Sequence, residues 1–137
     1  MTPAVLADIA ARAYQHMTPW SAVQFAATLS QNNHILTETQ HAFVLGQIVL
    51  DEVEILAVAT DPDHHRNGEA TRAFVAFRAK AKEKGAKTLL IEVAKNNLPA
   101  IGFYERHGFD RVGLRKNYYK RPDTSPMDAL IMSAKVA

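Results

Sequence analysis

The chain contains no cysteine among its 137 residues. This absence excludes disulfide cross-links, thiolate metal sites and a cysteine nucleophile, and it is compatible with a reducing compartment. The sequence also lacks an apolar run long enough to cross a bilayer, and its start has no basic segment followed by an apolar stretch. We therefore expect a cytoplasmic protein that has no membrane partner.

The chain also has almost no excess of positive over negative charge. Sixteen lysines and arginines face fourteen acidic residues, which leaves a net charge of +2. This balance does not indicate nucleic-acid binding, although it suits an anionic ligand. The hydrophobic content of 47% is that of an ordinary globular protein, and the length predicts one domain over 1–137. Either a monomer or a homodimer is compatible with these numbers.

Hydrophobic periodicity predicts a mixed α/β fold. Apolar residues recur at helical spacing in four segments and at strand spacing in six. Helices alternate with strands in the second half and follow a hairpin meander, which predicts a mixed sheet with helices on its faces. The predicted helices are 3–15, a short one capped by Ser21, 69–84 and 98–107, and the predicted strands are 34–39, 42–50, 53–60, 88–93, 109–118 and 128–133; a loop is expected at 120–126.

A polar turn at 61–71 joins a predicted strand to a predicted helix and contains Gly68. The first N–H groups of a helix have no intrahelical acceptor, and a glycine lets an anion approach the backbone closely. A pyrophosphate could therefore bind here, but an ordinary solvated turn has the same pattern. The spacing is that of neither a P-loop nor a dinucleotide-binding turn.

Three other kinds of site find no support. The six histidines, including His64 and His65, lack acidic or thiol partners at metal-ligand spacing, so we expect surface histidines and no metal. The serines lack the context of a nucleophile elbow. The lysines within 80–87 have no interleaved aromatic residues, which favours a solvated helix face over a nucleic-acid patch.

Three polar or aromatic side chains each have two interpretations. Glu92 interrupts an apolar strand, where it either meets a lysine across a sheet with one wet face or acts as a partly buried general base. Tyr104 is by default a core aromatic residue with its hydroxyl at the surface. Asn97 either caps the helix that begins at Leu98 or contacts a ligand.

Two segments together resemble the GNAT acetyltransferases. The first is the turn at 66–70, and the second has the order Asn-x-x-Ala-x-x-x-Tyr-x-x-x-Gly-Phe from Asn97 to Phe109. Shorter segments across nearly the whole chain, among them 19–21, 49–52 and 115–119, are similar to the RimI-type enzymes of that superfamily. Those enzymes acetylate the N-terminal alanine of a ribosomal protein.

The resemblance implies the GNAT fold, which is a mixed, mostly antiparallel sheet with helices on both faces and a splayed parallel strand pair. It implies acetyl-CoA as the cosubstrate and no metal. Glu92 would be the general base and Tyr104 the acid that protonates the CoA thiolate. The residues implied to bind the cofactor are Val58, Ala59 and Thr60 along the pantetheine, Arg66, Asn67, Gly68, Glu69, Ala70 and Thr71 at the pyrophosphate, and Asn97 and Tyr104 further along the chain.

The resemblance also implies an acceptor, the N-terminal alanine of a ribosomal protein, in a groove between the hairpin 109–133 and the Trp20 segment. A small-molecule amine, a lysine side chain, a non-catalytic CoA-binding module and an interaction domain without a cofactor stay open as alternatives. Two residues depart from the family pattern: His65 replaces glutamine or arginine, and Glu69 replaces an apolar residue. We expect the Glu69 carboxylate to repel a bound anion and weaken cofactor binding.

Overall fold

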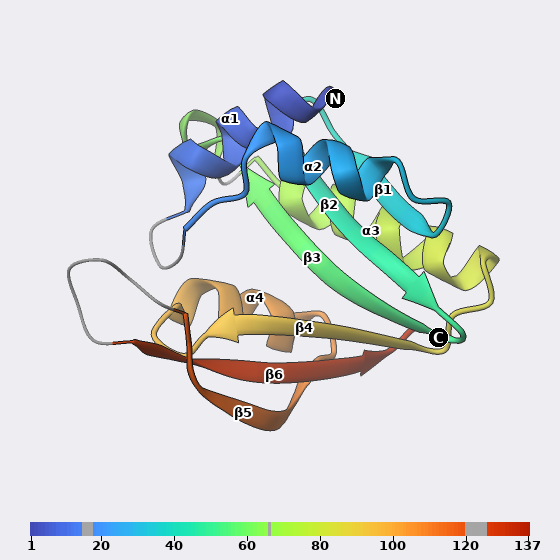
Figure 1. The fold of residues 1–137 in the computed structure, drawn as a ribbon. Helices are drawn as coiled ribbons and strands as arrows, with labels where there is room; N and C mark the ends of the chain where they lie inside the picture. Colours follow the sequence, from blue (N-terminus) through green and yellow to red (C-terminus); the bar gives the residue numbers. More distant parts are fainter. Residues whose placement is uncertain (15–17, 66, 120–125) are drawn as a thin grey trace.

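The computed structural model describes residues 1–14, 18–65, 67–119 and 126–137 (Figure 1). The predicted elements are all present, with ends that differ from the predictions by at most two residues, and a short 3₁₀ helix is added in the polar turn. Most of the predicted loop lies outside the described residues. In chain order the elements are α1 (Pro3–Ala13), α2 (Ala22–Leu29), β1 (His34–Glu38), β2 (Ala42–Val49), β3 (Glu52–Thr60), η1 (Pro62–His64), α3 (Glu69–Glu83), β4 (Thr88–Ala94), α4 (Leu98–Arg106), β5 (Asp110–Tyr119) and β6 (Met127–Lys135).

Local sequence signals set the ends of several helices. The Thr2 side chain caps α1, and Ser21 forms a capping box with Gln24 at the start of α2. Beyond the end of α3, Gly85 adopts a φ of 86°, a left-handed conformation that costs glycine little. No helix within the described residues is long and apolar enough to span a membrane.

The six strands form one sheet in the order β1-β2-β3-β4-β6-β5. Every neighbouring pair is antiparallel except β3 and β4, which are parallel. Helices α1 and α2 cover one face over β1 to β3, whereas α3 and α4 lie on the opposite face (Figure 1). The predicted fold class, a mixed and mostly antiparallel sheet with helices on both faces, is confirmed.

A β-bulge in β3 marks the point where the parallel strands separate. Leu45 of β2 pairs with Ala57, but Gly46 pairs with Ile55, so Leu56 is an extra residue in β3. The last parallel pair joins Ile55 to Ile91 of β4. Beyond it β3 follows β2 and β4 follows β6, and the two strands diverge toward their C-terminal ends (Figure 1). The structure therefore contains the predicted splayed pair.

Gly46 lies opposite this bulge, where a side chain would not fit. A Cβ atom there would lie 2.7 Å from Phe77 Cζ and 2.8 Å from the Glu54 carbonyl oxygen. Phe77 is fully buried between α3 and the sheet and has no space into which it could move. The close approach of α3 to the bulge therefore requires glycine at this position.

We expect Gly46→Ala to destabilise the protein by about 1–3 kcal/mol, because the added methyl group overpacks the core beside the bulge. Urea unfolding measures the change. Gly102→Ala is the control, since its Cβ would meet only the flexible end of Arg106, at 3.3 Å, within a helix that favours alanine. Equal unfolding midpoints for Gly46→Ala and the parent protein would contradict this account of the bulge.

Candidate active site

Glu92 lies one residue past the last parallel pair, at the edge of the splay. Its strand neighbours Ile91 and Val93 are buried in the cluster under α3 and α4, so Glu92 faces the opposite side of the sheet. Helices α1 and α2 do not extend over β4, β6 and β5 on that side (Figure 1). Its side chain is 19% exposed, so the carboxylate is partly buried and still reachable.

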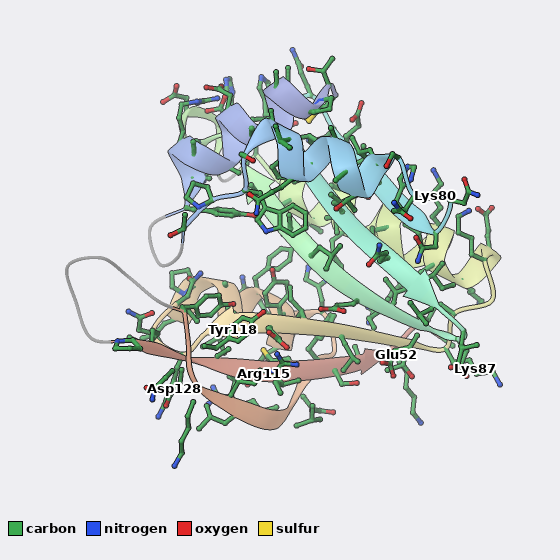
Figure 2. The ribbon with its side chains drawn as sticks, viewed as in Figure 1. Glu52, Lys80, Lys87, Arg115, Tyr118 and Asp128 are labelled. Carbon is green, nitrogen blue, oxygen red and sulfur yellow. The ribbon has the colours of Figure 1, made fainter. Side chains whose placement is uncertain are left out.

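The Glu92 carboxylate makes an ion pair with an arginine rather than with a lysine. Arg115 Nε lies 3.1 Å from Glu92 Oε1 and comes from β5, on the far side of β6. The Tyr119 hydroxyl donates to the Glu92 carbonyl oxygen at 3.2 Å. The pKa of Tyr118 is raised, mainly by burial. The negative charge of Glu92 and a hydrogen bond with the Glu92 side chain act in the same direction. Figure 2 shows Arg115 and Tyr118 beside β4 and β6, away from α1 and α2.

An irregularity in β5 brings these residues together. Regular pairing with β6 breaks between Arg115 and Tyr119, and Asn117 adopts a φ of 56°. The Asn117 N–H donates to Asp128 Oδ1 at 2.9 Å, which holds the irregular segment against β6. As a result, three side chains within five residues contact or face Glu92, which a regular strand would not allow. The sequence resemblance covered this segment but assigned none of its residues a role.

Tyr104 lies in the core, as the default interpretation of this residue expects. Its side chain is 5% exposed, and its ring packs against Phe74, Phe103 and Phe109. Burial raises the pKa of Tyr104, and the charges of Tyr14 and Tyr119 act in the same direction. The phenol therefore keeps its proton at neutral pH, as a proton donor must.

The segment Val58, Ala59 and Thr60 pairs with β2 on one side and has no partner in β4 on the other. Burial raises the pKa of Tyr14 to about 12, and a hydrogen bond with the Val58 backbone acts in the opposite direction. The Tyr14 hydroxyl therefore lies against the strand edge that opens at the splay. The sequence offered no signal for Tyr14, because it depends on where the end of α1 docks.

The turn that precedes α3 has the form of an anion site. Gly68 adopts a left-handed φ of 72°, and no side chain caps the helix. Asn67 and Thr71 are exposed at this turn, and Arg72 Nη1 donates to the Asn67 carbonyl at 2.9 Å, so a cation lies beside it. An uncapped helix start at the end of a splayed strand fits a long thioester that carries a pyrophosphate. Arg66 lies outside the described residues.

Hydrogen bonds connect the start of this turn, at Asp61, to α1. Arg12 donates to both carboxylate oxygens of Asp61, at 2.7 and 3.0 Å, and the Asp63 N–H donates to the same side chain at 3.0 Å. The hydrogen bond from Arg12 is the main reason that the pKa of Asp61 lies well below its ordinary value. This bidentate contact joins the helical layer to the strand end from which the turn departs.

Glu69 does not present a free carboxylate to the turn, although the weaker cofactor binding that we expect from it stays a prediction. Its side chain accepts from Thr39 Oγ1 at 2.7 Å and from the His41 N–H at 2.8 Å, and it lies 2.6 Å from His41 Nδ1. Glu69 is only 6% exposed. Hydrogen bonds from Thr39 and His41 therefore compensate the charge that we expected to repel an anion.

His41 and His64 also contact their neighbours around Glu69 and are not the free surface histidines that we expected. The ring of His41 stacks on that of His64 with centroids 3.5 Å apart. His65, the other departure from the family pattern, is exposed. The Thr39–His41 turn, η1 and the start of α3 therefore form one connected polar cluster.

Asn97 caps α4. Its Oδ1 accepts from the Ala100 N–H at 3.3 Å, so the capping interpretation is confirmed. The predicted contact with acetyl-CoA stays a prediction.

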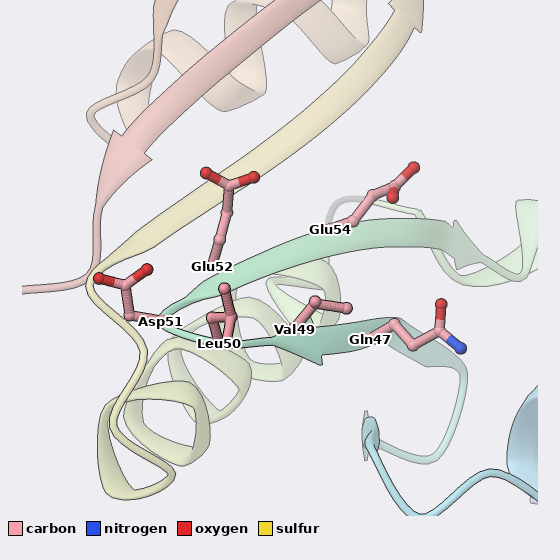
Figure 3. Close-up of a pocket in the computed structure, with 6 residues that line it drawn as sticks. All are labelled: Gln47, Val49, Leu50, Asp51, Glu52 and Glu54. Carbon is pink, nitrogen blue, oxygen red and sulfur yellow. The ribbon is translucent and has the colours of Figure 1, made fainter.

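A shallow hollow at the β2–β3 hairpin lies at the other end of β3 from the splay. Figure 3 shows Glu52 and Glu54 pointing to the same side of β3 there. It contains none of the residues that the sequence predicts to act. The residues that line it are Gln47, Val49, Leu50, Asp51, Glu52 and Glu54.

Comparison with known proteins decides the family. The model of the Acetyltransferase (GNAT) family matches residues 9–109. The chain belongs to the GNAT family. The [ribosomal protein bS18]-alanine N-acetyltransferase of Escherichia coli (strain K12) is 34% identical over 126 residues, which cover 89% of this chain and 84% of that enzyme.

Solved structures agree with this GNAT assignment. The crystal structure of the ribosomal-protein-S18-alanine N-acetyltransferase from Escherichia coli matches with a TM-score of 0.86 and 33% identity, over 97% of this chain and 86% of that one. A GNAT family acetyltransferase from Elizabethkingia anophelis with acetyl-CoA bound shares the fold at a TM-score of 0.73, with 16% identity over 93% and 88% of the two chains. The GNAT protein described here is thus an acetyl-CoA-dependent N-acetyltransferase.

The contacts of Glu69 predict an acid-dependent contribution to stability. The hydrogen bond from Thr39, followed by those from His41, lowers the pKa of Glu69 from 4.5 to about 2. The carboxylate therefore stabilises the fold above about pH 4.5, and this contribution is lost as the pH falls toward 2. We expect Glu69→Gln to lower the melting temperature at pH 7 and to flatten its decline between pH 5 and 3.

Glu83→Gln is the matched control, because Glu83 is exposed at the end of the same helix. Its melting temperature should follow that of the parent protein at every pH. If Glu69→Gln declined as steeply as the parent on acidification, the buried contacts would not stabilise the charged carboxylate.

Proposed function

We propose that this GNAT enzyme transfers the acetyl group of acetyl-CoA to the N-terminal α-amine of a ribosomal protein that begins with alanine. One geometric observation carries the proposal: Glu92 lies at the splay, on the part of its sheet face that α1 and α2 leave uncovered, while Tyr104 lies on the opposite, buried face. The identity to the Escherichia coli enzyme, over most of both chains, supports the acceptor.

The proposed cofactor site follows the open strand edge. Acetyl-CoA supplies a thioester. Those backbone groups around Val58, Ala59 and Thr60 that point to the open edge would hold the pantetheine and polarise the thioester carbonyl oxygen. The uncapped start of α3 at Gly68 would hold the pyrophosphate, with the backbone of Glu69, Ala70 and Thr71 next in the helix. The glycine and the absent side-chain cap leave room for an anion at these groups.

The proposed chemistry needs one base and one acid. An N-terminal amine has a reference pKa of about 7.7–8.0, so a modest base is sufficient to take its proton. Glu92 would accept that proton, directly or through one water, as the amine attacks the thioester carbon. Tyr104, protonated in the core, would donate to the departing sulfur. The C–S bond then breaks without a covalent enzyme intermediate.

A panel of acceptors tests the substrate. We expect a peptide with an N-terminal alanine, taken from the start of a bS18 protein, to gain 42 Da, the mass that an acetyl group adds to an amine. Mass spectrometry should detect no such gain on the same peptide with a blocked N-terminus and an internal lysine. Acetylation of small amines or lysine in place of the α-amine would overturn the proposed acceptor and leave the enzyme class intact.

Substitution of Glu92 tests the base. Glu92→Gln removes the proton acceptor and keeps the size of the side chain, so we expect turnover to fall about 10²–10⁴-fold. Acetyl-CoA should still raise the melting temperature of the variant, because the cofactor residues are unchanged. Turnover within a factor of two of the parent would exclude Glu92 as the base. A non-catalytic CoA-binding module would show the thermal shift in both proteins and turnover in neither.

The remaining inferences from the sequence stay predictions. A single domain over 1–137, a cytoplasmic location and a monomeric or homodimeric state are all compatible with the proposed reaction, which needs one site and one peptide.

A further inference from the structure

The contact between Arg115 and Glu92 has the geometry of a replaceable ion pair. Arg115 Nε lies 3.1 Å from Glu92 Oε1, but none of the hydrogen bonds within the described residues joins these two side chains, unlike the bidentate contact of Arg12 with Asp61. The Arg115 side chain is 55% exposed, and ion pairs with an exposed partner stabilise a fold only weakly. A second cation that reaches Glu92 can therefore take the place of Arg115.

Arg115 also has a second contact, with Tyr118, that does not depend on Glu92. Its guanidinium carbon lies 5.2 Å from the ring centroid of Tyr118, which favours a cation over its face. The hydrogen bond between Asn117 and Asp128 holds the irregular backbone that carries both residues. The guanidinium can therefore move away from the carboxylate and still keep an aromatic contact and water.

The acceptor brings the competing cation. At neutral pH most N-terminal amines are protonated, since their reference pKa is about 7.7–8.0. In the proposed reaction this ammonium must come within hydrogen-bonding distance of Glu92. Arg115 makes the one ion pair that Glu92 has among the described residues, so both cations need the same carboxylate.

We propose that Arg115 is a positioning residue that holds the Glu92 carboxylate between turnovers and is replaced there by the acceptor amine. This inference rests on the proposed function. While Arg115 is bound, it holds the Glu92 side chain at the splay. When the ammonium takes its place, one proton passes to Glu92 and from there to water, which leaves a neutral amine. The N–C bond then forms, the C–S electron pair leaves with sulfur, the second amine proton passes to Glu92, and Tyr104 donates a proton to the thiolate.

The product explains why Arg115 returns. An acetylated α-amine is a neutral amide and cannot compete for a carboxylate. Arg115 regains Glu92, which favours release of the second captured proton to water and departure of the peptide, and Tyr104 recovers its proton from water. Glu92 has then released two protons and Tyr104 has taken up one, so ammonium and thioester become amide, thiol and one proton in water.

Arg115→Gln tests the inference through separate measurements of KM and kcat. KM for the acceptor peptide should fall, since a competitor for Glu92 is gone, while KM for acetyl-CoA stays unchanged. Arg115→Lys retains a competing cation and should return KM for the peptide toward that of the parent protein.

Lys116→Gln is the matched control. It removes the same charge from the next residue, which is exposed and makes no ion pair among the described residues. Its KM for the peptide should equal that of the parent protein. If Arg115→Gln and Lys116→Gln gave the same KM for the peptide, or if Arg115→Lys behaved as Arg115→Gln, the exchange would be refuted. A loss of turnover in Glu92→Gln together with that outcome would overturn the role of Arg115 alone and leave the proposed function standing.

Discussion

The whole site depends on the extra residue in β3. In a regular parallel pair, the N–H and C=O groups of both strands bond to each other along their full length. Leu56 breaks that register beside Gly46, and the pairing of β3 with β4 ends at Ile55 and Ile91. The main-chain groups beyond this point are left without a β4 partner. The bulge thus creates the strand edge along which we propose that the pantetheine lies.

The splay also divides the two proposed proton-transfer groups between two environments. Tyr104 belongs to the packed layer beneath α4, where burial keeps its phenol protonated. Glu92 belongs to the open face, where an arginine and partial exposure suit a charged carboxylate. A donor and an acceptor of protons can therefore face one thioester from opposite sides, because the sheet between them is open at that point.

Three carboxylates around the candidate site each have a partner that compensates their charge. The Asp61 carboxylate is bound by Arg12, the Glu69 carboxylate by Thr39 and His41, and the Glu92 carboxylate by Arg115. The first two sites join the anion turn to α1 and to the β1–β2 turn through hydrogen bonds. The third is an ion pair without a hydrogen bond between the two side chains among the described residues. This difference separates carboxylates that hold the backbone in place from the one that we propose to exchange partners.

Much of the fold could be predicted from local pattern. Ser21, Gly85 and the alternation of apolar residues set helix ends and strand faces through interactions that span only a few residues. The turn before α3 was predicted to bind an anion in the same way, because a helix start with a glycine is a local feature. Likewise, Glu92 was noticed because a carboxylate inside an apolar strand is unusual.

The partners of these side chains could not be predicted in this way. Glu69 appeared free until the fold placed Thr39 and His41 around it, and Arg115 reaches Glu92 only because β6 lies between β4 and β5 and β5 is irregular. Tyr14 meets Val58 only where α1 docks. Periodicity reports which face of an element is buried. Contacts between residues far apart in the chain follow from strand order, bulges and helix docking, which no short window of sequence contains.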